Sequence, residues 1–278
     1  MLLALGAGRA PSLVTEIPTS QFPCERVAGL SISGRKWLAG GMRGLYIGEP
    51  NGQWKLVSDQ AVRQVATNAD GTWILYGNGS VDKVVVPQDR LYYDVFHGAV
   101  KRPWVSSMSS VGKGLTFGGH GGWFDRTSDK PVQESYPPAM SKQEVTCQLV
   151  LDGTRHVGTQ DGLFVFAKGG EKRLGFGNGL GDTWITSMAL VGSKVFVGTY
   201  TSGLYELADG VAKSVQSPSK RVRSLTQWQG NLVLGSLDGT WMLAGGEWKP
   251  LGDGETTFLT DANGQLVVGS VKSVRFFR

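Results

Sequence analysis

The chain has 278 residues, of which 40% are hydrophobic and 18% are charged, and its formal net charge is +5. This hydrophobic content is enough for a substantial core, and no run of Lys and Arg residues marks a stripe that binds nucleic acid. No apolar stretch is long enough to cross a membrane as a helix. We therefore expect neither nucleic acid nor a membrane span among the partners of this chain.

The first residues, 1–12, include a short apolar segment that closes on small residues, as the end of a secretory signal does. We expect residues 1–12 to be a flexible N-terminus or a signal remnant. This interpretation predicts a periplasmic or secreted location and leaves a cytoplasmic one open. Residues 13–278 are expected to form a single domain.

A short pattern recurs along the chain: an apolar run, a glycine, a few loop residues, a second glycine, and then an apolar residue with an aromatic one. We call the first glycine of each copy the repeat glycine. The repeat glycines are spaced 34 to 41 residues apart, at Gly40, Gly77, Gly118, Gly158, Gly198, Gly235 and Gly269. A period of about 40 residues built from short apolar strands and glycine turns is typical of a β-propeller blade.

Each repeat has room for four short strands, one before the apolar run and two after it. The apolar runs are continuous rather than alternating, as in Val195–Val197, which indicates strands that are covered on both faces. The sequence therefore predicts an all-β fold, a seven-bladed β-propeller with four-stranded antiparallel blades. The last repeat lacks a fourth strand, and we expect the N-terminal strand near residues 12–18 to close the last blade and cover its edge.

The fifth repeat carries a more specific motif. It has an Asn-Gly-Leu lead-in at residues 178–180, a first strand at residues 185–188 and a Val-Gly-Thr core that continues to Leu207. This stretch resembles the propeller repeat of the two-component-regulator family. The resemblance implies a periplasmic, bacterial sensor-like module, often for oligosaccharides, joined to a signalling kinase. For this chain we expect a free-standing propeller without a kinase domain.

In a four-stranded meander, the turn into the first strand and the turn between the second and third strands lie on the same rim. Counting fourteen residues back from each repeat glycine gives Arg26, Arg63, Trp104, Glu144, Trp184, Arg221 and Glu255. The turns between second and third strands add Arg43, His120, Asp161, Tyr200, Asp238 and Lys272. Aromatic faces beside charged groups suit a carbohydrate, a peptide or a protein partner. The alternative is that these charged pairs and tryptophans close the mouth of the propeller and bind nothing.

No catalytic motif accompanies these residues, so we favour a non-enzymatic binding protein and expect a monomer without cofactor or metal. Two alternatives stay open. Glu144, Asp161, Asp238 and Glu255 could serve a carbohydrate-active hydrolase or lyase, which needs paired carboxyl groups. The arginines could instead make the chain a scaffold or assembly factor that binds protein.

The cysteines and one histidine are expected to be structural. Cys24 and Cys147 fall in the first and fourth repeats, too far apart to form a disulfide. His156 falls in a predicted strand, where we expect a core residue with satisfied hydrogen bonds.

Overall fold

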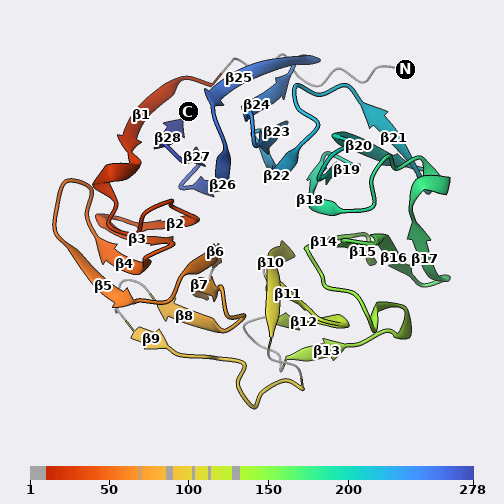
Figure 1. Ribbon diagram of the computed structural model, residues 1–278, viewed down its shortest axis with the longest axis horizontal. Helices are drawn as coiled ribbons and strands as arrows, with labels where there is room; N and C mark the ends of the chain where they lie inside the picture. Colours follow the sequence, from red (N-terminus) through yellow and green to blue (C-terminus); the bar gives the residue numbers. More distant parts are fainter. Residues whose placement is uncertain (1–10, 69, 86–89, 102–103, 112–113, 127–131) are drawn as a thin grey trace. The chain divides into compact units, whose positions relative to one another are not determined.

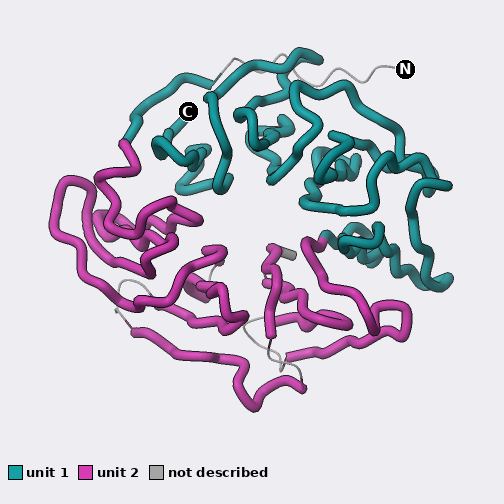
Figure 2. Tube along the Cα trace, viewed as in Figure 1, with its two compact units in different colours: residues 1–17, 149–278 teal, residues 18–148 magenta. Residues whose placement is uncertain are grey.

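The computed structural model describes residues 11–68, 70–85, 90–101, 104–111, 114–126 and 132–278. Residues 1–10, which belong to the predicted flexible N-terminus or signal remnant, lie outside the described residues. The chain divides into two compact units, shown in different colours in Figure 2. Unit 1 comprises Met1–Ile17 and Leu149–Arg278, and unit 2 comprises Pro18–Gln148.

Three four-stranded blades belong to unit 2, and in each the strands follow one another in chain order (Figure 1). Blade one contains β2 (Gly29–Ser33), β3 (Lys36–Gly41), β4 (Gly44–Gly48) and β5 (Trp54–Ser58). Blade two contains β6 (Val62–Asn68), β7 (Gly71–Tyr76), β8 (Val81–Val85) and β9 (Arg90–Tyr92). Blade three contains β10 (Val105–Val111), β11 (Gly114–Gly119), β12 (Gly122–Arg126) and β13 (Gln133–Ser135).

The remaining four sheets are blades four to seven. Blade four contains β14 (Cys147–Leu151), β15 (Thr154–Thr159), β16 (Gly162–Ala167) and β17 (Gly170–Leu174). Blade five contains β18 (Ile185–Val191), β19 (Lys194–Thr199), β20 (Leu204–Ala208) and β21 (Val211–Val215). Blade six contains β22 (Val222–Trp228), β23 (Asn231–Ser236), β24 (Gly239–Ala244) and β25 (Glu247–Asp253). Blade seven contains β26 (Thr256–Ala262), β27 (Gln265–Ser270), β28 (Ser273–Phe277) and β1 (Leu13–Pro18).

Seven four-stranded antiparallel sheets make the fold a seven-bladed β-propeller, as the repeat predicts. The helical part of the described chain is three single turns of 3-10 helix: Thr19–Gln21, Pro138–Met140 and Phe176–Asn178. No helix in the described ranges is long and apolar enough to cross a membrane.

The predicted closure of the last blade by the N-terminal strand is confirmed, because β1 pairs with β28. The backbone N–H groups of Ser12 and Arg278 each donate to the other residue's carbonyl, at 2.8 and 3.0 Å. Side chains reinforce the pairing. Glu16 accepts hydrogen bonds from Ser273 Oγ at 2.6 Å and from Arg275 Nε at 2.8 Å, and these two donors lower the pKa of the Glu16 carboxyl.

The repeat glycine has a packing reason, which is close contact with the blade that follows. A Cβ atom on Gly198 would lie 2.4 Å from Cγ1 of Val222, the first residue of β22. A Cβ on Gly118 would lie 2.3 Å from Cγ1 of Val145. Both distances are below any real carbon contact, so a larger residue would push the neighbouring blade away. The repeat glycines Gly118 and Gly198 therefore lie where one blade contacts the next.

Blade two has no glycine at the position of the repeat glycine. Ser107 pairs with Gly118 and Ser187 with Gly198 after a β-bulge, and the matching pair in blade two is Gln64 with Leu75. Leu75 is fully buried, and it stands where the other blades have their repeat glycine. Gly77, which the spacing assigned to this role, lies two residues further on.

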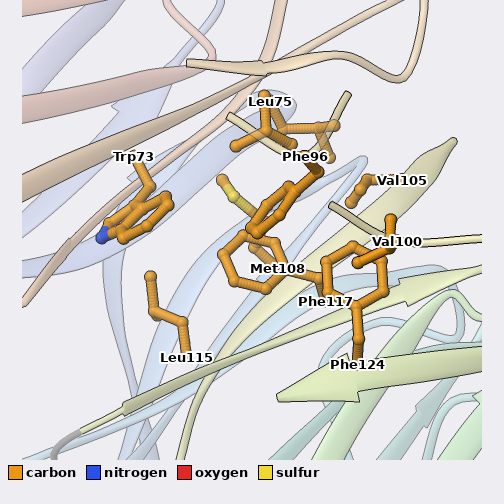
Figure 3. Packing of buried hydrophobic residues seen from close by; sticks show 10 residues of the cluster. Trp73, Leu75, Phe96, Val100, Val105, Met108, Leu115, Phe117 and Phe124 are labelled. Atoms are coloured by element: carbon orange, nitrogen blue, oxygen red, sulfur yellow. The ribbon is translucent and has the colours of Figure 1, made fainter. Parts of the chain in front are cut away.

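Beside Leu75, blades two and three enclose an aromatic cluster (Figure 3). Phe96 comes from the segment after β9, and its ring centroid lies 4.7 Å from those of Phe117 and Phe124. Trp73 stacks on Phe96 with centroids 6.0 Å apart. Leu75 is buried in the same cluster as these rings, so the larger side chain at the glycine position packs against them.

Neither Cys24 nor Cys147 forms a disulfide, as predicted. Burial raises the pKa of the Cys24 thiol to about 12. The expectation for His156 is wrong in one respect. The residue lies in β15, where burial lowers its pKa, but Nδ1 has no hydrogen-bond partner among the described residues.

Candidate binding corners

In unit 1, the turn that leads into a blade's first strand is tied to the loop between the second and third strands of the same blade. We call these two segments together the corner of the blade. The same tie recurs in three consecutive blades, between Asp182 and Thr201, between Ser219 and Asp238, and between Asp253 and Lys272. The corner is thus a repeated local structure. In each of these three blades, a side-chain hydrogen bond holds the turn before the first strand against the loop between the second and third strands.

The blade-five corner, residues 182–184 and 200–202, carries an aromatic platform. Trp184 directly precedes β18, and its ring stacks on Tyr200 with centroids 4.4 Å apart and planes 25° apart. The Trp184 side chain keeps 38% exposure, which is high for a residue of this size. Neither Nε1 of Trp184 nor the Tyr200 hydroxyl has a hydrogen-bond partner in the described part of the chain. The platform therefore presents an apolar ring face with two polar groups at its edge.

Asp182 fixes both halves of this platform. Its Oδ1 accepts the backbone N–H of Trp184 at 2.9 Å. Its Oδ2 accepts the backbone N–H and the hydroxyl of Thr201, each at 2.8 Å. The backbone of Tyr200 also donates to the Trp184 carbonyl at 3.0 Å. Because both rings are anchored before any ligand arrives, little conformational entropy is lost on binding.

The blade-six corner, residues 219–221 and 237–238, is ionic instead of aromatic. Ser219 Oγ donates to Asp238 at 2.6 Å, and Arg221 forms an ion pair with the same carboxylate. The Ser219 hydrogen bond and the Arg221 guanidinium lower the pKa of the Asp238 carboxyl. Asp238 is therefore held as a carboxylate, the opposite of what a general acid requires.

The other charged residues predicted in unit 1 are paired as well. Glu255, directly before β26, accepts from Arg223 at 3.0 Å. Asp161, in the loop after β15, binds Arg173 through both its backbone carbonyl and its carboxylate. Arg223 and Arg173 were not among the predicted site residues.

In unit 2, Arg26, one of the two predicted residues of blade one, lies in a strained loop beside Glu25, and this loop contacts the turn that carries the other, Arg43. Glu25 and Arg26 both have φ of 46°, a left-handed conformation that is uncommon outside glycine. The loop is held by backbone hydrogen bonds from Met42 to Glu25 and from Arg43 to Cys24, and Arg43 forms an ion pair with Glu25 at 2.6 Å.

The position predicted for Arg63 needs a correction. Val62 pairs with Tyr76 just as Val105 pairs with Gly119, so the residue that precedes the first strand of blade two is Ala61. Arg63 is instead the bulge residue inside β6, with an exposed side chain. The count failed because Gly77 is displaced from the place of a repeat glycine.

The remaining predicted residues in unit 2 belong to blades three and four. His120 and Glu144 form an isolated antiparallel bridge through their backbones. Trp104 directly precedes β10 and is 49% exposed. Of the predicted residues, the structure thus joins Trp184 to Tyr200, Arg221 to Asp238, and His120 to Glu144.

Sequence reasoning missed Asp182 and Ser219, which position the predicted residues. A signal was present in each case. An Asp or Ser three residues before the first position of a strand accepts the backbone N–H of the residue directly before the strand, which is the usual Asx or Ser turn. Asp182 before Trp184 and Ser219 before Arg221 both fit this pattern.

One carboxyl group of unit 2 has a raised pKa. Burial raises the pKa of Asp82 in β8, where the carboxylate accepts from the Tyr76 hydroxyl at 2.9 Å and from the backbone N–H of Asp94 at 2.8 Å. This pair anchors the segment that carries Phe96. Within the described ranges, no group of three or more His, Cys, Asp or Glu residues is placed to hold a metal ion.

No protein-family model and no curated protein matches the chain. Solved structures do resemble it. The extracellular domain of the hybrid two-component system BT3049 from B. thetaiotaomicron aligns with a TM-score of 0.76 and 13% identity, over 96% of this chain and 42% of that one. This chain therefore spans about two fifths of the BT3049 domain.

Two further structures align over nearly their whole length. The WD40 propeller domain of Doa1 has a TM-score of 0.70 and 12% identity, with 97% of each chain covered. Virginiamycin B lyase from Staphylococcus aureus has a TM-score of 0.68 and 10% identity, with 96% of this chain and 99% of the lyase covered. At such identities the likenesses show the shared propeller fold, which serves several functions.

Proposed function

We propose that this chain is a non-enzymatic binding propeller that recognises a neutral carbohydrate at the blade-five corner. The observation that carries the proposal is the anchored stack of Trp184 on Tyr200. Flat aromatic faces bind the apolar faces of sugar rings. Polar groups at the edge of the aromatic ring form hydrogen bonds with the sugar hydroxyls. Trp184 Nε1 and the Tyr200 hydroxyl are suited to this role because the described chain does not use them.

The size of the exposed ring sets the expected affinity. A tryptophan side chain offers about 250 Å², and 38% of the residue is exposed. Covering about 90 Å² at about 25 cal/mol per Å² contributes roughly 2 kcal/mol. With two or three hydrogen bonds of about 1 kcal/mol each, the total of about 4–5 kcal/mol corresponds to a dissociation constant of about 0.2 to 1 mM. Such weak binding of single sugar units fits a protein that recognises a polymer.

The charges around the platform favour a neutral ligand. Arg221 is engaged by Asp238, Arg223 by Glu255, and Arg173 by Asp161. An anionic ligand would have to displace a carboxylate from its arginine, which removes much of the energy gained. A neutral, polyhydroxylated ligand can stack on Trp184 without breaking these pairs.

Two features support a binding role over hydrolysis or elimination. The Asp238 carboxyl has a lowered pKa, so it is poorly suited to protonate a leaving group. The carboxyl with a raised pKa, Asp82, is only 5% exposed and engaged in holding a loop.

We also propose a periplasmic or secreted location. The BT3049 domain that the chain resembles is extracellular, and the N-terminal segment is compatible with the end of a secretory signal. Fractionation of the source cell, followed by immunodetection, tests this: the protein is expected in the periplasmic or secreted fraction, and recovery with cytoplasmic markers would contradict it.

The binding proposal is tested by thermal unfolding with three neutral hexasaccharides, maltohexaose, cellohexaose and chitohexaose. Binding at about ten times Kd should raise the melting temperature of the wild type by about 3 °C. Trp184→Ala should reduce the rise by at least half. Tyr93→Ala, which removes a 70% exposed ring of unit 2, is the matched control and should keep the full rise. An undiminished rise in Trp184→Ala, or no rise with any of the three sugars, would overturn the proposal.

A further inference from the structure

Trp104 in blade three occupies the same position as Trp184 in blade five. Each directly precedes a first strand, and each of those strands opens with the same pairing, Val105 with Gly119 and Ile185 with Thr199, followed by a β-bulge. Trp104 keeps 49% exposure, more than Trp184 does. The repeat therefore presents a tryptophan ring twice, once in each compact unit.

The Trp104 ring rests on the backbone of Gly79. A Cβ on Gly79 would lie 2.6 Å from Cδ2 of Trp104, so the ring lies against the glycine with no side chain between. Gly79 has φ of 80°, which a residue with a side chain rarely adopts. The residue directly after the tryptophan is tied to the same point, because the N–H of Val105 donates to the Gly79 carbonyl at 3.0 Å. One face of the ring is thus covered by backbone, which leaves the other for a ligand.

Polar side chains beside Gly79 are already ordered. Asn78 Oδ1 accepts from the backbone N–H of Ser80 at 3.0 Å and from its hydroxyl at 2.8 Å. Asn78 Nδ2 donates to Gln60 Oε1 at 2.7 Å. The Gln60 amide nitrogen and Trp104 Nε1 have no hydrogen-bond partner among the described residues. The Gln60 amide, which is hydrogen-bonded to Asn78, and Trp104 Nε1 therefore remain available to donate to a ligand.

We propose that Trp104, Gln60, Asn78 and Ser80 form a second carbohydrate site in unit 2, separate from the blade-five corner. The proposal takes its ligand class, a neutral sugar, from the proposed function. The site repeats the chemistry of the first, an anchored indole face with unsatisfied donors at its edge, but with amide groups in place of the Tyr200 hydroxyl. The amides can donate to ring hydroxyls or to an acetamido carbonyl.

The two sites are distinguishable by the indole N–H signals of their tryptophans. The experiment is a titration of ¹⁵N-labelled protein with maltotriose, cellotriose and chitotriose, followed by ¹H–¹⁵N spectra. Trp104→Phe and Trp184→Phe assign the two signals. We expect both to shift and to saturate. The indole N–H groups of Trp73 and Trp248 are bound internally, to Asn68 Oδ1 at 3.3 Å and to the Gln216 carbonyl at 2.8 Å, and should stay in place as internal controls.

Each outcome separates the two proposals. A shift of Trp104 that persists in Trp184→Phe supports the second site independently of the first. A shift of Trp184 alone, with Trp104 unmoved at saturation, overturns the second site and leaves the proposed function intact. A shift of Trp104 alone overturns the blade-five site. No shift of either signal with any of the three sugars overturns both.

Discussion

The blade-five and blade-three tryptophans occupy one position of the repeat, yet they are supported in different ways. Trp184 stacks on a side chain of its own blade, Tyr200, and Asp182 ties the two together. Trp104 rests on the backbone of Gly79, which belongs to the loop of the preceding blade. The two blades therefore share the position of the exposed ring and differ in the contacts that hold it.

The largest expected effect comes from removing the backbone support of Trp104. Gly79→Ala places a Cβ where φ is 80° and where the indole ring lies 2.6 Å away. Strain and displacement of the ring should lower the free energy of unfolding by about 2–3 kcal/mol. Gly77→Ala is the matched control, because its Cβ would meet nothing closer than 3.7 Å. Urea unfolding measures both, and equal losses in the two variants would contradict this role of Gly79.

The carboxylate support of Trp184 should contribute less. In Asp182→Asn, an amide nitrogen replaces the oxygen that accepts the N–H and hydroxyl of Thr201. We expect a loss of about 1 kcal/mol in stability and roughly tenfold weaker hexasaccharide binding. Asp209→Asn, in a left-handed turn of the same blade that suits Asn, should change neither quantity. Unchanged binding in Asp182→Asn would show that the platform does not depend on this anchor.

The stacking of Trp184 on Tyr200 is expected to contribute less to stability than the Asp182 hydrogen bonds do. A double-mutant cycle of Trp184→Ala and Tyr200→Ala, followed by urea unfolding, should give a coupling energy of about 0.5 kcal/mol, as for exposed aromatic pairs. The corresponding cycle of Trp104→Ala with Tyr200→Ala should give no coupling, since Trp104 rests on glycine. Coupling in the second cycle and not in the first would reverse the comparison.

The smallest effect concerns the ionic blade-six corner and its pH dependence. The Ser219 hydroxyl and Arg221 lower the pKa of Asp238 below its ordinary value of 3.8. A carboxyl with a lowered pKa in the folded state stabilises the protein above its ordinary pKa, and this contribution disappears as pH falls through the lower folded value. Asp238→Asn should therefore lose a little stability at neutral pH and show a shallower decline below about pH 4.

Melting curves of Asp238→Asn and the wild type at stepped pH values measure this. Asp152→Asn, in an exposed turn with φ of 48°, is the control and should follow the wild type. A steeper acid decline in Asp238→Asn than in the wild type would contradict the assignment.

Much of the fold could be predicted because its causes are local in sequence. Continuous apolar runs and glycine turns recur at a nearly constant period, and the missing strand of the last repeat has its counterpart before the first. The register of blade two could not be predicted, because Gly77 imitates a repeat glycine whose place Leu75 has taken. Only the packing of Phe96, Phe117 and Phe124 beside Leu75 shows how the larger residue is accommodated.

The candidate sites were predicted in part. Trp184 with Tyr200 and Arg221 with Asp238 follow from the repeat, since the turn before the first strand meets the loop between the second and third strands in blades five, six and seven. The supporting residues did not follow, because the role of Asp182 depends on how a turn and a loop 19 residues apart meet in space. The pairing of Arg223 with Glu255 likewise depends on contact between consecutive blades.

The central claim is that a neutral sugar binds through an anchored aromatic ring and not through the charged groups of the corners. The most direct test is calorimetric titration with maltohexaose, cellohexaose and chitohexaose at about 20 mM and about 500 mM NaCl, where the screening of charges differs greatly. The account predicts that at least one of them binds with a Kd that changes less than twofold between the two salt concentrations, and that Trp184→Ala removes the share of this binding that belongs to the blade-five corner. Binding that weakens steeply with salt and is unchanged in Trp184→Ala would contradict it.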